Sequence, residues 1–237
     1  MRIKLRCLPG YEAFLPKPQL AKAALPEWLK AMRSLAASPV LDGGEVRTVK
    51  TCPPFIDALG AGILFPLAAD VQLVEGSLSW DWKLPVQAAA RMTRSPIGLH
   101  LPEQLAGVPL AQDADSFVVK FTNFWTLELP EGWSMLFCHP FNREDLPFRT
   151  LTGLVDCDRW RNGFVHFPAL WTDPLFSGTL PAGTPVAQAL PVRREALKLE
   201  FAEMDPAELA LHLEVQDGLQ EDPGLYRRHY RAAGREA

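Results

Sequence analysis

Two aspartates stand one residue apart in the stretch GLVDCDRWRNG. Residues two apart in a strand project to the same face, so Asp156 and Asp158 would point one way and Cys157 the other. Two close carboxylates can bind a metal. Alternatively, one stays ionised as a catalytic base that orients a water, while the pKa of its neighbour is raised. In the simpler interpretation both are solvated turn residues, or form ion pairs with Arg159 and Arg161.

The same stretch carries a tryptophan between two arginines. Trp160 in a turn fits core packing poorly, so it is a candidate to cover a planar ligand. Arg143, Arg159 or Arg161 would then bind a negative group on that ligand. The alternative is that this tryptophan, like others in the chain, fills a β core.

Three histidines in the middle of the chain are candidate metal ligands: His100, His139 and His166. Neutral imidazole together with Asp156 or Asp158 would suit Fe(II), Zn or Cu, so the cofactor considered is a divalent transition metal. No H-x-H or H-x-D spacing occurs, and the site would depend entirely on the fold. The alternative is three unrelated, hydrogen-bonded histidines.

Short strands separated by turns must position these residues, because the chain has 22 prolines and 16 glycines. The stretch at Asp156 is expected to be a strand, a turn at Arg161-Asn162-Gly163 and a return strand. The pattern indicates a mainly β protein, an antiparallel jelly-roll or β-clip-like barrel of about 8–12 strands. The predicted strands of its second half are SFVVKFT, FWTLELP, WSMLFCHPF, FRTLTGLVD, GFVHFPALW, TPVAQALPVRR and LKLEFAEM.

Helical segments are expected to flank the barrel. Residues 1–50 form an N-terminal arm and a helix, in PEWLKAMRSLAAS, packed on the barrel of residues 51–204. Residues 205–237 form a C-terminal helical extension. Its first helix starts with Asp205 as the cap and a proline at the first helical position.

Three stretches between residues 129 and 193 follow one another: PEGWSMLFCHPFN, GLVDCDRWRNG and PAGTPVAQALPVRRE. In order and spacing they resemble the P-x-G turn, the G-[VIL]-[IV]-D-x-D-Y hairpin and the G-x-x-[IV]-A-Q strand of the dUTPase and dCTP-deaminase family. The resemblance implies a β-clip fold in which Asp156 activates the attacking water and an aromatic next to the position of Trp160 packs on the sugar or base. Gln188, from the last motif, joins the candidate ligand-binding residues. The family's phosphate-binding P-R-S-G is CHPFNRED here.

Longer motifs span most of the chain, among them VKTCPPFIDALGAGILFPLAADV, HLPEQLAG and GTPVAQALPVRRE. They resemble an uncharacterised family of bacterial and phage-encoded proteins. This second resemblance implies no activity and no catalytic residues.

Charge and composition narrow the classes of partner. The formal net charge of −4 provides no positive field for a nucleic-acid backbone, so nucleic acid is not expected as a main partner. No apolar run reaches the roughly 18 residues of a membrane span, so no membrane partner is expected. Four cysteines without a C-x-x-C indicate reduced thiols and a cytoplasmic protein.

Three functions stay open on the sequence alone. The first is a small-molecule-binding β-barrel with hydrolase-like activity at Asp156. The second is a metal-dependent, cupin-like oxygenase. The third is a non-catalytic, phage-type accessory or assembly protein. Self-association into a homo-oligomer is compatible with each of them.

Overall fold

The structure is a computed structural model, and it forms two compact units. It describes residues 1–82, 84–87, 91–108 and 117–232. Unit 1 consists of Met1–Leu25 and Leu59–Arg194, and unit 2 of Pro26–Ala58 and Glu195–Ala237. The boundaries differ from the predicted segments 1–50, 51–204 and 205–237, because the first 25 residues belong with the sheets while residues 26–58 group with the C-terminal part.

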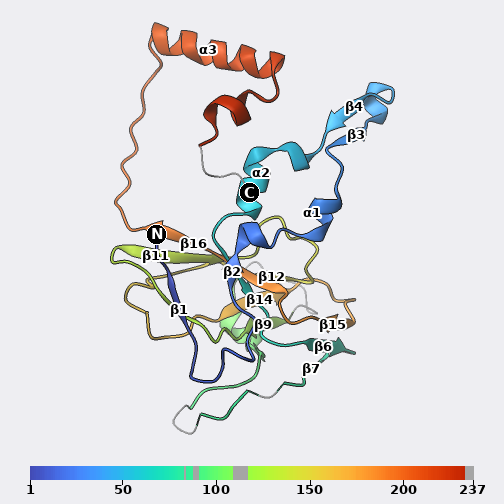
Figure 1. The fold of residues 1–237 in the computed structure, drawn as a ribbon, viewed down its shortest axis with the longest axis vertical. Coiled ribbons are helices and arrows are strands. Elements are labelled where there is room, and N and C mark those ends of the chain that lie inside the picture. The colour runs from blue at the N-terminus through green and yellow to red at the C-terminus, as the bar shows by residue number, and fades with distance from the viewer. Residues whose placement is uncertain (83, 88–90, 109–116, 233–237) are drawn as a thin grey trace. The chain divides into compact units, whose positions relative to one another are not determined.

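The chain is mainly β, as predicted, and its strand pairs are antiparallel (Figure 1). The described residues of unit 1 form four sheets, with the orders β1-β10, β13-β11-β16-β5-β2, β12-β14-β9-β8 and β15-β6-β7. Within the described residues each sheet has two edges and none closes into a barrel. The strands are β1 (Lys4–Arg6), β2 (Gln19–Leu20), β5 (Ile63–Pro66), β6 (Val71–Val74), β7 (Ser77–Ser79), β8 (Ile97–Leu99), β9 (Val118–Phe121), β10 (Thr126–Glu128), β11 (Trp133–Cys138), β12 (Phe148–Thr150), β13 (Gly153–Val155), β14 (Phe167–Trp171), β15 (Gly178–Leu180) and β16 (Pro185–Arg193).

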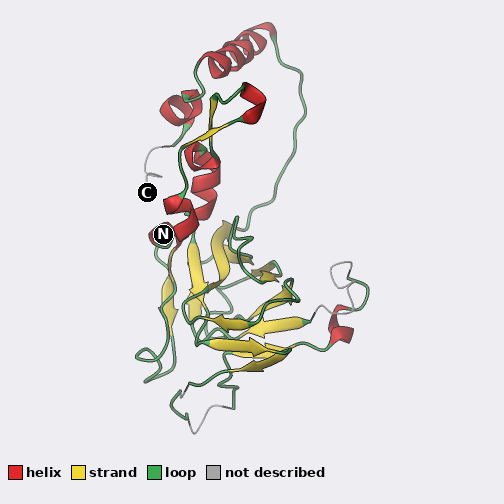
Figure 2. Ribbon diagram, turned by 90° about the vertical axis from the view of Figure 1, so that its right-hand side faces the viewer, coloured by secondary structure: helices red, strands yellow, loops and turns green. Residues whose placement is uncertain are grey.

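An aromatic core joins the five-stranded and the four-stranded sheets of unit 1. Phe65 on β5 and Phe137 on β11 face Phe167 on β14, with ring centroids 5.3 and 5.4 Å from that of Phe167. Figure 2 shows strands of this unit running in crossing directions. Alternation along each strand puts these rings on the inner faces, where their burial stabilises the packing of the two sheets.

The stretch around Asp156 crosses from one sheet to the other. β13 pairs with β11, whereas β14 pairs with β9 and β12. The expected hairpin is therefore wrong, and so is the single strand expected for FRTLTGLVD, because β12 and β13 belong to different sheets. Local turn chemistry fixes where a chain bends but not which strand it pairs with afterwards. We call residues 156–163 the crossing segment.

The described part of unit 2 contains helices and one hairpin. The helix expected over PEWLKAMRSLAAS ends early, at Ala31, because Leu35–Ala37 pairs with Glu45–Arg47 around a turn with Asp42 at a φ of 48°. Two 3-10 turns flank the second hairpin strand. The elements are α1 (Glu27–Ala31), β3 (Leu35–Ala37), β4 (Glu45–Arg47), α2 (Pro53–Leu59), α3 (Pro206–Glu221) and the π-helical turn Tyr226–Tyr230.

The start of α3 confirms the predicted cap. The Asp205 carboxylate accepts hydrogen bonds from the backbone N–H groups of Ala207 and Glu208, at 2.8 and 2.9 Å. The Glu208 carboxylate accepts one in return from the Asp205 N–H, at 2.9 Å, which completes a capping box. The helix is thus locally encoded, and it has no buried residue.

A helix that crosses a membrane must be both long and apolar. Across the part of the chain that the structure describes, no helix combines sufficient length with sufficient apolar character.

Candidate functional site

Arg194 is the centre of the polar cluster that contains both predicted aspartates. It follows the last residue of β16, and its backbone N–H donates to the carbonyl oxygen of Gly132, at 2.9 Å. Its Nη1 donates to Asp158 Oδ1 at 2.9 Å and to Asp156 Oδ1 at 3.2 Å, and its Nη2 donates to Asp158 Oδ2. The guanidinium of Arg194 therefore connects the crossing segment to the end of β16 through hydrogen bonds.

Asp158 is the buried member of the pair, with a side chain only 5% exposed. Its Oδ2 also accepts a hydrogen bond from the Gly132 backbone N–H, at 2.9 Å. The hydrogen bonds from Arg194 are the main reason that the pKa of this carboxyl lies well below its usual range. Because both oxygens already have donors, Asp158 holds the segment in place and is poorly suited to reach a substrate.

Asp156 is the accessible member, with a side chain 48% exposed. Its Oδ1 accepts from Ser134 Oγ at 2.6 Å as well as from Arg194. Ser134 lies on β11 and is fully buried. A carboxylate anchored through one oxygen and open to solvent can orient a water molecule, so Asp156 keeps the geometry of a candidate base.

The aspartates and Cys157 do not alternate along a strand as expected, because β13 ends at Val155 and residues 157–159 form a turn. Cys157 is buried, and burial is the main reason that the pKa of its thiol rises to about 11. The two aspartates nevertheless share one partner. That partner is Arg194, which sequence reasoning placed in a strand without assigning it a role. The expected alternative partners, Arg159 and Arg161, do not supply these ion pairs.

Trp160 folds back on its own turn. Its indole Nε1 donates to the carbonyl oxygen of Phe164, at 3.2 Å. A Cβ added at Gly163 would lie 2.1 Å from the Trp160 ring, so this ring needs the missing side chain at Gly163. The turn is held from outside by Arg6, which donates to the Arg161 carbonyl oxygen. The indole therefore packs on the crossing segment, although 55% of the residue is exposed.

Arg143 and Gln188 serve other contacts. Arg143 forms a two-pronged ion pair with Asp145, at 2.8 and 2.9 Å. Gln188 is 1% exposed; its Oε1 accepts from the Phe141 N–H at 2.8 Å, and its Nε2 donates to the Ala61 carbonyl at 2.6 Å. The Arg143 ion pair thus lies within one loop, whereas Gln188 on β16 binds the backbone of Phe141 and Ala61.

The three histidines also bind separate partners. His139 Nε2 lies 3.0 Å from the Arg143 carbonyl oxygen, and His139 Nδ1 accepts from the Thr150 N–H at 3.2 Å. His166 Nδ1 accepts from the Asn123 N–H at 3.3 Å, and His100 Nδ1 lies 3.0 Å from Gln104 Oε1.

Burial lowers the pKa of two of these imidazoles, His139 and His166. A neutral imidazole could ligate a metal, but only with other donors close by. Within the described residues, no three or more His, Cys, Asp or Glu side chains come together in a metal-binding arrangement. The expected metal cluster of these histidines with Asp156 or Asp158 is therefore not found among the described residues.

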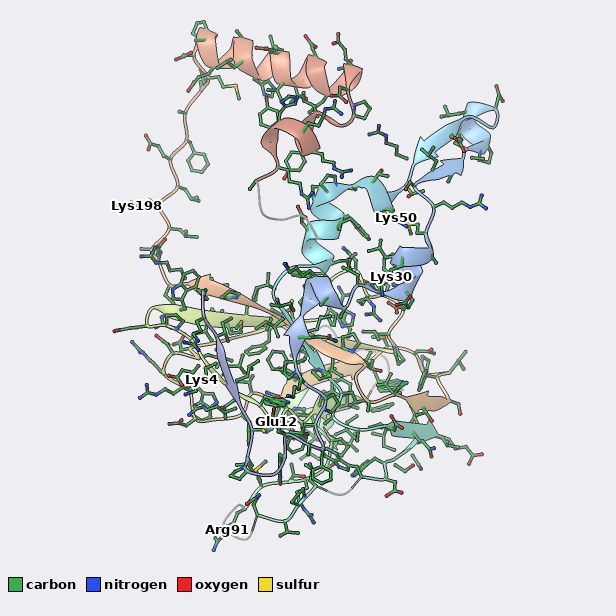
Figure 3. All side chains as sticks on the ribbon, in the orientation of Figure 1. Lys4, Glu12, Lys30, Lys50, Arg91 and Lys198 are labelled. Carbon is green, nitrogen blue, oxygen red and sulfur yellow. The ribbon has the colours of Figure 1, made fainter. Side chains whose placement is uncertain are left out.

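A second candidate site is a surface. Glu195–Asp205 joins β16 to α3; we call it the linking segment, and Figure 3 labels its Lys198. The segment was expected to form a strand, LKLEFAEM, but no residue from 196 to 204 lies in a helix or strand. Its alternating apolar side chains are strongly exposed: Leu197 89%, Leu199 82% and Phe201 90%.

Comparison with known proteins adds no relative. No protein-family model matches the chain, and no curated protein matches it.

Proposed function

We propose that the protein is a non-catalytic assembly protein that binds another protein chain through the linking segment. The main support for this proposal is a row of three large apolar side chains at strand spacing in that segment, each more than four-fifths exposed. Burying one such side chain contributes about 1.5–3 kcal/mol. A contiguous row of this kind is a feature of surfaces that bind partners.

Strand addition is the binding mode that suits this segment. Its side chains alternate with a period of two: Leu197, Leu199 and Phe201 on one face, Lys198 and Glu200 on the other. Its backbone pairs with no described strand. An extended segment that adds to a sheet edge satisfies its backbone groups and places alternate side chains in a groove.

The test is the molecular mass of the purified protein and of the complex recovered from its native cells, measured by light scattering. We expect a species heavier than the 26.4 kDa of one chain in at least one of them. The triple substitution Leu197→Asp, Leu199→Asp, Phe201→Asp should remove it. Ala202→Asp, on the opposite face of the same segment, should not. A wild-type mass of one chain in both samples would contradict the proposal.

A second candidate function is the hydrolase-like activity expected at Asp156. It is favoured by the half-exposed carboxylate held by Ser134 and Arg194, and by the resemblance of residues 129–193 to the dUTPase and dCTP-deaminase family. With that resemblance we infer a jelly-roll-like arrangement of the two facing sheets. Asp156 would orient and deprotonate the attacking water.

We also propose a cytoplasmic location. The four cysteines Cys7, Cys52, Cys138 and Cys157 are free thiols. Proteins of reducing compartments keep their cysteines in this form. Disulfide-free protein isolated from the cytoplasmic fraction is the expected result.

A further inference from the structure

We propose that the chain bound by the linking segment is a second copy of this protein, and that the segment adds as a strand in an apolar groove on unit 1 of that copy. The inference rests on the proposed function and names its partner. The groove has a volume of about 490 Å³. Its apolar lining includes Met1, Ile3, Leu5, Leu20, Ile63 and Pro191.

The groove is bordered by strands that have room for a neighbour. Leu5 lies on β1 and Ile3 stands directly before it; among the described strands β1 pairs with β10 alone. Gln19 and Leu20 form β2, the edge of the five-stranded sheet, which pairs with β5 alone. Exposed strand edges are the templates to which an extended segment adds.

The apolar side chains of groove and segment correspond in kind and spacing. Ile3 and Leu5 are two residues apart at the start of β1, where both are partly buried against the core of unit 1, and Leu20 in the same groove lining is 56% exposed. The segment presents Leu197, Leu199 and Phe201 with the same period of two. An inserted strand can therefore bury both rows against each other.

The charges are complementary. The linking segment carries four acidic residues and one lysine, a formal net charge of −3: Glu195, Glu200, Glu203, Asp205 and Lys198. On the acceptor, Lys22 lines the groove. Arg2 and Lys4 alternate with Ile3 and Leu5 at the start of β1, where Figure 3 labels Lys4. Opposite charges of this kind favour encounter and fix the register of the added strand.

Each chain carries one segment and one groove, so two copies can satisfy both exchanges at once. Such a reciprocal exchange gives a closed, two-fold symmetric dimer. The two exchanges are equivalent, and a chain that lacks either its segment or its groove can still take part in one of them.

The experiment is a complementation test between two deficient variants. The donor-deficient variant carries Leu197→Asp, Leu199→Asp and Phe201→Asp. The acceptor-deficient variant carries Leu20→Asp and Lys22→Glu, both at exposed positions. Ala202→Asp and Leu175→Asp, the latter at a residue 90% exposed, are the matched controls.

We expect wild type and both controls to be dimers by analytical ultracentrifugation. Each deficient variant alone should be monomeric, with dimer affinity weakened at least ~100-fold, and retain the wild-type near-ultraviolet circular dichroism. An equimolar mixture of the two should recover a dimer, because one intact segment and one intact groove remain. Recovery excludes misfolding as the cause of the loss.

Other outcomes separate this inference from the proposed function. If wild type dimerises and the acceptor-deficient variant does too, the groove is not the acceptor, while association through the segment stands. A monomeric wild type that still forms a segment-dependent complex in native cells overturns only the second copy as partner. A monomeric wild type in which the segment protects the groove of its own chain from hydrogen exchange also overturns the inference.

Discussion

Two connecting segments of this protein are of similar length but differ in whether their side chains have partners within the chain. The crossing segment is rich in charged and polar residues, yet its aspartates, its tryptophan and its turn carbonyl all have partners within unit 1. The linking segment is rich in leucine and phenylalanine, yet those side chains are 82–90% exposed. From composition alone, the crossing segment would be expected to be exposed to solvent and the linking segment to be buried.

The difference shows what fixes a segment in place. Arg194 supplies directional hydrogen bonds that match two carboxylates, and these specify one position for the crossing segment. Apolar side chains gain free energy only when a complementary surface covers them. The crossing segment is therefore complete within one chain, whereas the linking segment needs another surface.

The largest expected effect comes from a pair of phenylalanines. Phe137 is 2% exposed in the core of unit 1, and Phe201 is 90% exposed in the linking segment. Phe137→Ala should lower the free energy of unfolding by about 3–5 kcal/mol, through lost burial and the cavity left behind. Phe201→Ala should change it by less than about 0.5 kcal/mol at concentrations where the chain is monomeric. Urea unfolding measures both, and a large loss for Phe201→Ala would mean that the segment packs within its own chain.

The substitution Arg194→Gln, which removes the positive charge after β16, should have a smaller effect on the free energy of unfolding. The pKa of Asp158 is lowered in the folded state, so the unfolded state binds more protons between that low value and about 3.9. Wild-type stability from this ion pair is therefore fully present above about pH 5 and declines as the pH falls through that window. Arg194→Gln should be less stable than wild type near neutral pH, and the difference should shrink toward pH 2.

Arg159→Gln, in an exposed arginine of the crossing segment, is the matched control and should follow the wild-type pH dependence. Thermal unfolding across pH 2–8 by circular dichroism makes the comparison. A difference between Arg194→Gln and wild type that does not vary with pH would show that this ion pair does not hold the segment.

Only a small effect on stability is expected for Asp156→Asn, since this side chain is half exposed and keeps an acceptor for Ser134. The free energy of unfolding should change by less than about 1 kcal/mol. If the second candidate function is correct, hydrolysis of a nucleoside triphosphate by wild type should fall at least ~100-fold, because the base is lost. The rate of hydrolysis is measured by the release of phosphate or pyrophosphate. If the wild-type protein has no activity on such substrates, this candidate function is ruled out.

Local signals in the sequence predicted local features well. Asp205 and the proline after it predicted the start of α3, because a capping box is made by residues three apart. Alternation predicted that Asp156 and Asp158 share a side; both carboxylates do bind Arg194, although β13 ends at Val155 and residues 157–159 form a turn. Short strands between prolines and glycines predicted a mainly β chain.

The sequence could not determine which strands pair or which side chains meet. The residues of the crossing segment do not reveal that Arg194, over 30 positions away, holds them, or that β13 and β14 belong to different sheets. The alternation in LKLEFAEM is correct for a strand, but a strand exists only where an edge pairs with it. Periodicity and capping are set by neighbours along the chain. Pairing, ion-pair partners and exposure are decided by the tertiary structure, because they depend on which distant surfaces are brought together.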